Sequence, residues 1–321
     1  MREQDQSRVV DAVVIGRNEG ERLLACLRSL QGQVRHVVYV DSGSADGSQA
    51  AAAALGAEVV VLDADEPFTA ARARNAGLRA LAADPPGFVQ FTDGDCEVQP
   101  GWIATALAAF DEHPRAVVVC GRRRERFPEA SVYNRLADRE WDTPPGPALA
   151  CGGDALMRHA AVAAVGGYRA DLIAGEEPEL CLRLRRAGGE VWRIPAEMTL
   201  HDAAMTRFVQ WWRRSRRAGH AFAEGAALHG APPDRHWVAE TRRALLWGAV
   251  LPLAVVLAGL AHPAGWLLVL LWPAQMARLA RRGGPEWAFF TVLGKFAEAQ
   301  GALGYYLDRL RGRRRGLIEY K

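Results

Sequence analysis

Short runs of β-branched residues alternate with Ala-, Leu- and Arg-rich stretches of helical length between residue 9 and about residue 200. Alternation of this kind is typical of βα units and a largely parallel sheet. Strands are predicted at residues 9–15, 36–40, 58–62, 88–92, 116–120 and 190–194. Several of these runs end in a polar motif, and the ligands of open α/β sheets gather at the carboxyl ends of strands. The pattern therefore predicts an α/β, Rossmann-like, mostly parallel sheet flanked by helices, with a site at its strand ends.

A long apolar region follows after about residue 240. Residues 244–277 contain no Asp, Glu, Lys or Arg, and the turn-forming sequence AHPAG interrupts them at residues 261–265. An uncharged helix of about 18 residues spans about 27 Å, close to the thickness of the hydrocarbon core of a bilayer. A membrane hairpin of two helices is therefore predicted. By the positive-inside rule, both of its ends lie in the cytoplasm, because arginines flank it: Arg242, Arg243, Arg278, Arg281 and Arg282.

Two alternatives apply to this apolar region. Pro273 lies within the short second helix, so this helix could be re-entrant or interfacial, and the whole hairpin could be buried in a soluble domain. Residues 287–307 interleave apolar positions with Lys295 and Glu298, which favours a helix lying in the membrane surface. We therefore predict an α/β domain over residues 1–235 and a membrane-associated helical region over residues 236–321.

Charge and cysteine content narrow the expected partners and compartment. The 40 Lys and Arg residues barely outnumber the 37 Asp and Glu residues, so nucleic acid is not expected as a partner. The five cysteines have no paired spacing, and the polar N-terminus does not resemble a secretory signal. The α/β domain is therefore expected in the cytoplasm, at the inner (cytoplasmic) membrane. Further basic residues that anionic lipid headgroups would attract are Arg213, Arg214, Arg216, Arg217, Arg309, Arg311, Arg313, Arg314 and Arg315.

Polar motifs follow the first two predicted strands. Carboxylates at strand ends can accept hydrogen bonds from a nucleotide base and from ribose hydroxyls, and small residues let a nucleotide approach the backbone closely. Alternatively, Ser44 or Asp46 merely caps the helix that begins near Ser48. The candidates for nucleotide contacts are Arg17, Glu19, Asp41, Ser42, Gly43 and Ser44.

A predicted helix and the fourth strand add further candidates. Arg74 could reach a phosphate and Asn75 a hydroxyl, although an arginine on a helix surface is usually only solvated. Asp93 and Asp95 follow the apolar strand with one glycine between them. Two carboxylates in that arrangement can provide oxygen ligands to Mg²⁺ or Mn²⁺, which in turn bridges a diphosphate. Such triplets also occur in surface turns, and the apolar run before this one is what favours a metal site.

Acidic residues open a helix near residue 176. Glu176, Glu177 and Glu179 fall in its first turn, where the helix dipole favours acids whatever their function. In the functional interpretation, Glu177 removes a proton from an acceptor hydroxyl as general base, and Glu176 holds sugar or acceptor hydroxyls. His201 follows the last predicted strand and could complete a metal shell or contact a diphosphate, although a single histidine is more often structural.

Taken together, these motifs resemble the inverting glycosyltransferases of family 2, which have the GT-A fold, over residues 9–215. VVIGRNEGERL and VDSGSADGS are similar to the family's nucleotide motifs, ARARNAGL to the helix entry that contacts the nucleotide, and TDGD to the metal-binding triplet. The resemblance implies that Asp95 coordinates the metal and that Asp93 contacts ribose or metal. GEEPELCLRLRRAG resembles the acidic acceptor motif, with Glu177 where Asp is usual. QWWRR only partly resembles the QxxRW segment of processive members, because it ends in Arg214, so polymer synthesis has little support.

The sequence therefore predicts a metal-dependent, inverting enzyme that moves a sugar from a nucleotide diphosphate donor to an acceptor hydroxyl at the cytoplasmic membrane face. The expected cofactor is Mg²⁺ or Mn²⁺, and the expected acceptor is lipid-linked or amphiphilic. A sugar nucleotidyltransferase is one alternative, but it would carry a basic Gly-rich phosphate loop where Arg17, Asn18 and Glu19 stand. The other alternative is a catalytically inactive, membrane-anchored subunit that binds nucleotide sugars. The presence of every expected acidic residue argues against it.

Overall fold

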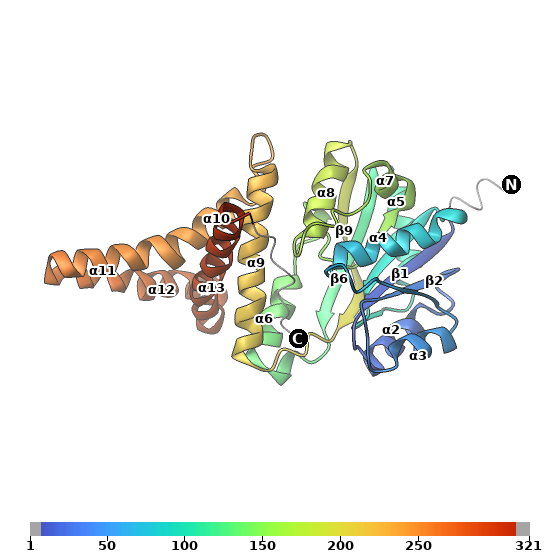
Figure 1. Cartoon of the computed structure of the whole chain (residues 1–321), viewed down its shortest axis with the longest axis horizontal. Helices are drawn as coiled ribbons and strands as arrows, with labels where there is room; N and C mark the ends of the chain where they lie inside the picture. Colours follow the sequence, from blue (N-terminus) through green and yellow to red (C-terminus); the bar gives the residue numbers. More distant parts are fainter. Residues whose placement is uncertain (1–7, 313–321) are drawn as a thin grey trace. The chain divides into compact units, whose positions relative to one another are not determined.

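The computed structural model describes residues 8–312 and divides them into two compact units that join between Thr206 and Arg207 (Figure 1). The first unit contains the sheet, and the second is helical. The helix over Phe208–His229 therefore belongs to the helical unit, whereas the sequence analysis included it in an α/β domain ending at residue 235. Residues 1–7 lie outside the described residues, as do three of the predicted lipid-facing arginines, Arg313, Arg314 and Arg315.

A mixed sheet of nine strands forms the centre of the first unit in the described part of the chain. The strands are β1 (Val10–Gly16), β2 (Val37–Asp41), β3 (Glu58–Val61), β4 (Phe88–Asp93), β5 (Cys96–Val98), β6 (Ala116–Glu125), β7 (Gly146–Pro147), β8 (Ala155–Arg158) and β9 (Glu190–His201). Their order is β3-β2-β1-β4-β8-β6-β9-β5, and β7 pairs with β9. The run β3-β2-β1-β4 and the pair β6–β9 are parallel, whereas β8, β5 and β7 pair antiparallel with their neighbours. The predicted α/β class is confirmed.

The central strand β1 explains where the site forms. Its sequence VDAVVIG is buried along its length apart from the last residue, as expected for a strand covered on both faces. The register of the parallel strands pairs Gly16 with Asp41 and Ile15 with Asp93. The carboxyl ends of β1, β2 and β4 therefore meet at one edge of the sheet, and the polar loops that follow them come together.

The sequence pattern did not predict the short strands, and it predicted the last strand to end at residue 194, seven residues too early. β5 and β8 have only three and four residues, too few to show a periodic pattern. β9 continues to His201 because its second half pairs with both β6 and β5. This extension places His201 directly opposite Cys96.

Helices flank the sheet and connect most of its strands (Figure 1). Most of them present small or apolar residues to the core, as Leu23, Leu27 and Leu30 do in the helix Glu21–Leu30. The helices are α2 (Glu21–Leu30), α3 (Ser48–Ala54), α4 (Ala70–Ala80), α5 (Trp102–Glu112), α6 (Val132–Trp141), α7 (His159–Ala164) and α8 (Glu176–Arg186), with short 3₁₀ helices at Leu81–Ala83 and Pro128–Ala130.

The second unit contains the predicted apolar hairpin. Its first arm runs without interruption through α10 (Val238–Leu245), a π-helical segment (Leu246–Val250) and α11 (Leu251–Ala261). The chain turns at His262, whose Nδ1 accepts a hydrogen bond from the Ala264 backbone N–H at 3.1 Å. The second arm is the 3₁₀ segment Pro263–Leu270 followed by α12 (Leu271–Gly283). The break therefore lies where the sequence predicted it.

Two long helices complete this unit, α9 (Phe208–His229) and α13 (Pro285–Leu310). Glycines allow their backbones to approach closely: a Cβ on Gly219 would lie 2.0 Å from the Glu298 carbonyl oxygen, and one on Gly301 would lie 1.9 Å from that of Arg216. Small residues at helix crossings permit such contact. The helix predicted over residues 287–307 is thus present as part of α13 and packs along α9.

Candidate active site

The loops that follow β1 and β2 are bonded to each other. The Asn18 backbone N–H donates to Ser44 Oγ at 2.9 Å, and Asn18 Oδ1 accepts from the Ala45 N–H at 2.8 Å. The Gly20 N–H donates to Asp46 Oδ2 at 3.0 Å. Asn18 has a φ of 55°, a left-handed conformation that asparagine tolerates better than most residues. The two predicted nucleotide-binding loops are therefore held together by the chain itself.

Asp41 organises the second of these loops. Its buried Oδ1 accepts hydrogen bonds from the Gly43 and Ser44 N–H groups at 2.9 and 2.8 Å and from Gln49 Nε2 at 2.9 Å. Its Oδ2 accepts from the Tyr39 hydroxyl at 2.8 Å. Burial works to raise the pKa of Asp41, but the hydrogen bonds, those from Ser44 first, outweigh it and lower the pKa. In this structure Asp41 holds the turn, and its contact with a nucleotide stays a prediction.

Arg17 and Glu19 occupy the first loop. The Arg17 guanidinium carbon lies 5.5 Å from the centroid of the Phe68 ring, and a Cβ on Gly43 would come within 3.1 Å of the same ring. Gly43 also has a φ of 82°, so both its conformation and the nearby ring favour glycine there. Glu19 Oε2 forms an ion pair with Arg22 at 2.7 Å.

Arg74 connects two acidic motifs that are far apart in the sequence. Its side chain is buried in α4, and its Nη2 donates to Asp93 Oδ1 at 2.8 Å while its Nη1 donates to Glu176 Oε1 at 2.7 Å. Burial acts to lower the pKa of Arg74, but the nearby charges, that of Asp93 first, outweigh burial and raise the pKa above its ordinary value. The guanidinium therefore stays charged. The predicted phosphate-binding arginine therefore joins the end of β4 to the first turn of α8.

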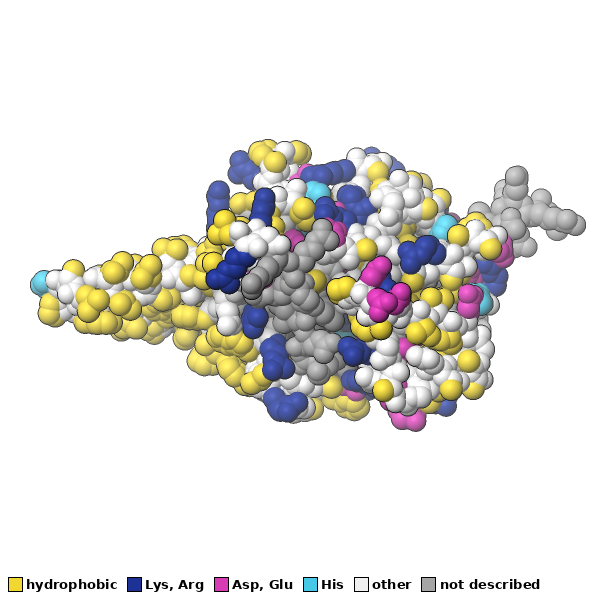
Figure 2. All heavy atoms as spheres, in the orientation of Figure 1, with side chains coloured by type: hydrophobic (Ala, Val, Ile, Leu, Met, Phe, Trp, Pro, Cys, Tyr) yellow, Lys and Arg dark blue, Asp and Glu magenta, His cyan; other side chains and the backbone are white. Residues whose placement is uncertain are grey.

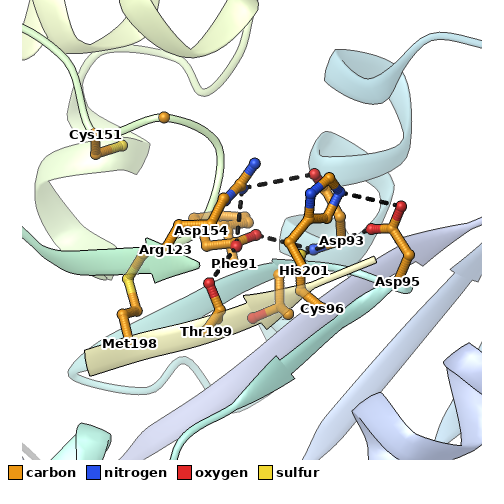
Figure 3. A network of polar contacts seen from close by, with 12 residues as sticks. Phe91, Asp93, Asp95, Cys96, Arg123, Cys151, Asp154, Met198, Thr199 and His201 are labelled. Carbon is orange, nitrogen blue, oxygen red and sulfur yellow. Dashed lines mark hydrogen bonds and ion pairs between the residues drawn. The ribbon is translucent and has the colours of Figure 1, made fainter. Parts of the chain in front are cut away.

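A second buried arginine lies on the other side of Asp93. Arg123 Nη2 forms an ion pair with Asp154 Oδ2 at 2.8 Å and lies 3.8 Å from Asp93 Oδ2 (Figure 3). The fully buried Asp154 also accepts from the Thr199 hydroxyl at 2.9 Å and from the Asp93 N–H at 3.2 Å. Sequence reasoning missed this pair. Arg123 stands among three consecutive arginines, a pattern typical of a surface, and Asp154 precedes the unpredicted strand β8.

Asp95 and His201 form the part of the site that best fits a metal ion. His201 Nε2 lies 3.2 Å from Asp95 Oδ2 (Figure 3). Burial lowers the pKa of His201 to about 4, and the charge of Arg123 acts in the same direction, so the imidazole is neutral near pH 7. Its buried Nδ1 has no hydrogen-bond partner among residues 8–312. A carboxylate with a neutral imidazole is a suitable donor set for a divalent cation, whereas burial raises the pKa of the adjacent Cys96 thiol and keeps it protonated.

Glu177 is held by a loop that precedes β8. Its Oε1 accepts from the Cys151 N–H at 2.7 Å, and its Oε2 accepts from the Gly152 N–H at 2.9 Å. The thiols of Cys151 and Cys181 donate to Oε1 at 2.9 and 3.0 Å. The predicted general base is therefore 4% exposed and hydrogen-bonded at both oxygens.

The same loop also passes close to Asp93 and Arg123. A Cβ on Gly153, the residue after Gly152, would lie 3.0 Å from Arg123 Nη2 and 3.7 Å from Asp93 Oδ2. Gly152 and Gly153 have φ values of 91° and 102°, which side-chain-bearing residues rarely adopt. The two glycines thus allow this loop to hydrogen-bond Glu177 through its backbone N–H groups and to pass close to Arg123 and Asp93.

Asn75 has a structural role in this arrangement. Its Nδ2 donates to the Tyr168 carbonyl at 2.7 Å, and its Oδ1 accepts from the Tyr168 N–H at 2.8 Å. Both ends of the amide are therefore used to hold the turn before α8. Each end of the amide can still form one more hydrogen bond, so the hydroxyl contact expected from the sequence stays a prediction. Glu179 likewise has a protein partner, Arg183, at 2.8 Å.

Residues 11–160 match the sequence model of the family described as Glycosyl transferase family 2. Residues 11–160 therefore belong to glycosyltransferase family 2. The match runs from β1 to beyond β8, so it contains the two predicted nucleotide-binding loops, Arg74, Asp93, Asp95 and Arg123. The chain is also 27% identical, over 307 residues, to the Pre-mycofactocin glycosyltransferase of Mycobacterium tuberculosis. That alignment covers 89% of this chain and 60% of the relative, so the chain spans about three fifths of the relative's length.

Two solved structures share the fold of this chain. The mannosyltransferase PcManGT from Pyrobaculum calidifontis, in complex with GDP-Man and Mn²⁺, has a TM-score of 0.64 at 21% identity and covers 94% of this chain and 87% of its own. S. aureus TarS 1–349, in complex with UDP-GlcNAc, has a TM-score of 0.52 at 13% identity, with 95% and 92% covered. These similarities confirm the predicted GT-A fold.

Proposed function

We propose that this family 2 glycosyltransferase transfers a sugar, with inversion and with a divalent metal, from a nucleotide diphosphate donor to the hydroxyl of a lipid-linked or amphiphilic acceptor. The observation that carries the proposal is the bridge made by Arg74 between Asp93 and Glu176. It joins the strand end that would face the donor to the helix that would face the acceptor. Transfer requires these two groups of residues at one place.

Asp95 and His201 are the residues that would hold Mg²⁺ or Mn²⁺. Their separation, the neutral imidazole and the unpaired Nδ1 support this assignment. The metal, when bound, would neutralise negative charge on the departing diphosphate. Asp93, fixed between Arg74 and Arg123, would contact ribose or metal. The mannosyltransferase PcManGT was solved with Mn²⁺, which agrees with this choice of cofactor.

The loops after β1 and β2 would bind the nucleotide. Arg17, Glu19 and the turn held by Asp41 lie on loops already bonded to each other, so little order would have to be gained on binding. PcManGT and TarS were solved with GDP-Man and UDP-GlcNAc respectively, so nucleoside diphosphate sugars are the donor class to test.

We assign proton removal to Glu177, with Glu176 fixed by Arg74 beside it. An inverting displacement needs a base that accepts the proton of the attacking hydroxyl. Both oxygens of Glu177 accept hydrogen bonds from the loop in this structure. Oε2 accepts a single hydrogen bond there, so its second lone pair would accept the proton of the acceptor hydroxyl.

The helical unit supports a location at a membrane. The continuous helix Val238–Ala261 has 24 residues and is long and apolar enough to cross a bilayer. Several of its large side chains are exposed, with Leu257 and Leu260 at 58% and 75%, and Figure 2 shows hydrophobic side chains covering this arm. The two arms and α13 also line an open crevice of about 450 Å³ whose walls include Val255, Trp272 and Phe296. Arginines at the hairpin ends suit the cytoplasmic face, where the catalytic unit would act.

Donor binding by the full-length chain in detergent tests the proposal. GDP-mannose, UDP-glucose and UDP-N-acetylglucosamine are titrated by calorimetry with Mn²⁺, with Mg²⁺ and with chelator. We expect one donor to bind in a metal-dependent manner and its sugar to move to a membrane lipid extract. Release of pyrophosphate from a nucleoside triphosphate and a sugar phosphate would instead identify a nucleotidyltransferase. Binding without transfer to any extract would favour the inactive subunit.

A further inference from the structure

Glu177 is a buried carboxylate without a cationic partner. Its neighbours in the same helical turn differ: Glu176 is paired with Arg74, and Glu179 with Arg183. No Lys, Arg or His within residues 8–312 forms an ion pair with Glu177. Its hydrogen bonds come from two backbone N–H groups and two thiols, whereas buried carboxylates are usually paired with a cation or bound to a metal.

Two cysteine sulfurs lie beside this carboxylate. Cys151 Sγ is 2.9 Å and Cys181 Sγ 3.0 Å from Glu177 Oε1, and the two sulfurs are 3.9 Å apart. Two thiolates bound tetrahedrally to one zinc ion lie about 3.8 Å apart, because each Zn–S bond is about 2.3 Å long. The sulfur pair therefore already has the spacing of a zinc site.

We propose that Cys151, Glu177 and Cys181 form a zinc site with two sulfur ligands and one oxygen ligand. Soft thiolates favour Zn²⁺ over Mg²⁺ and Mn²⁺, so this site would not compete for the metal assigned to Asp95 and His201. Figure 3 shows Cys151 on a loop apart from those two residues. The adjoining Gly152 is exposed, so we expect an ion and a fourth ligand, water, to enter from the loop side.

Zinc binding at this site releases protons. Burial raises the pKa of the Cys151 thiol well above its ordinary value, and the adjacent Cys181 adds to the effect, so the thiol is protonated at neutral pH. Zn²⁺ displaces one proton from each sulfur to solvent, and the two thiolates bind the ion. The apparent affinity should therefore rise as the pH is raised.

The consequence for activity rests on the proposed function. A zinc ion on Oε1 would occupy the carboxylate assigned as general base and would hold it on the loop side. Zinc is then an inhibitor of transfer that Mn²⁺ cannot displace. Metal binding itself does not depend on that role, so the two claims can fail separately.

Cobalt provides the direct test. Full-length chain in detergent, reduced and freed of metal, is titrated with Co²⁺ while the near-ultraviolet sulfur-to-cobalt charge-transfer band is recorded. We expect a band that saturates at one ion per chain and is abolished by one equivalent of Zn²⁺. Cys181→Ser and Cys151→Ser should each reduce the band by about half or more, whereas Cys96→Ser, beside the Asp95 site, and Cys120→Ser should keep it.

Several results would overturn the site. These are a native chain with no band, a band lost in Cys96→Ser, or a band unaffected by both cluster variants. Thermal unfolding of each variant shows whether it is folded. If Cys151→Ser and Cys181→Ser do not fold, the cobalt titration of the native chain decides whether the site exists. Should the band appear while added zinc leaves the transfer rate unchanged, the zinc site stands and the assignment of Glu177 as base falls.

Discussion

Arg74 Nη1 lies 2.7 Å from Glu176 Oε1, which bonds the helix after β3 to the helix that begins with Glu176 and Glu177. The two residues are 102 positions apart in the chain. Because the same guanidinium also binds Asp93, one side chain sets the distance between the two acidic motifs.

Replacing this arginine with lysine should separate these motifs. In Arg74→Lys a single ammonium group cannot reproduce both bonds of the planar guanidinium. We expect kcat/KM to fall about 100-fold or more, equivalent to about 2.7 kcal/mol of transition-state stabilisation. Steady-state kinetics with the identified donor measures this. Arg72→Lys, on the same helix but bonded to the backbone carbonyls of Asp63 and Glu66, is the control and should keep near-native kinetics.

Asp95→Asn tests the metal assignment. The amide keeps the shape of the side chain but loses the charge that a divalent cation requires, so metal-dependent donor binding should weaken at least tenfold. His201→Gln should act in the same direction. Calorimetric titration of the donor with and without Mn²⁺ measures both. The assignment is contradicted if Asp95→Asn binds donor with native affinity and native metal dependence.

The two glutamates of the acceptor motif can be told apart by their partners. Glu177→Gln should lower kcat about 100-fold or more, if it is the base, and leave donor affinity within a few fold. Glu176→Gln removes the charge that faces Arg74 and should change both kcat and donor affinity. Single-turnover rates and donor titrations are compared for the two variants. If Glu177→Gln transfers sugar at the native rate, another residue must act as the base.

The close contact between α9 and α13 predicts how glycine substitutions change the stability of the second unit. A Cβ at Gly219 would lie 2.0 Å from the Glu298 carbonyl oxygen, so Gly219→Ala forces α9 and α13 apart and should cost about 1–3 kcal/mol. Gly294 is the matched control on α13, since the nearest atom to its added Cβ is 3.6 Å away. Gly294→Ala should be neutral or slightly stabilising. Thermal unfolding in detergent distinguishes them, and equal midpoints for the two variants would contradict the packing described here.

Membrane insertion of the first hairpin arm can be tested with a single charge. Leu253→Arg places a cation at an exposed position near the middle of the uncharged part of the first arm, residues 244–261, at a cost of about 2.5–3.5 kcal/mol in a bilayer. The full-length variant should float with liposomes less completely than the native chain. Leu310→Arg, at an exposed leucine outside the hairpin, should float normally. A native chain that stays soluble without detergent and does not float would contradict the membrane location.

Much of the fold and the order of the site motifs could be predicted from sequence. Strands buried on both faces produce long apolar runs, and the register of β1, β2 and β4 then brings the motifs at their ends to one edge. The apolar hairpin was equally visible, because an uncharged stretch broken by a His-Pro turn has a clear local signature. Such features depend on residues that are neighbours in the chain.

Only the tertiary structure decided which groups bind one another. The insertion of β8 antiparallel between β4 and β6 places Asp154 beside Arg123 and Asp93, and the sequence contains no local sign of that strand order. The same holds for Glu177, whose oxygens are bound by backbone N–H groups 25 and 26 residues away. Hydrogen bonds and ion pairs of buried groups depend on distances of a few tenths of an ångström, and these are set by long-range packing. The amino-acid types along the chain determined which chemistry is available, while the packing decided which acids face an arginine, an imidazole or a pair of thiols.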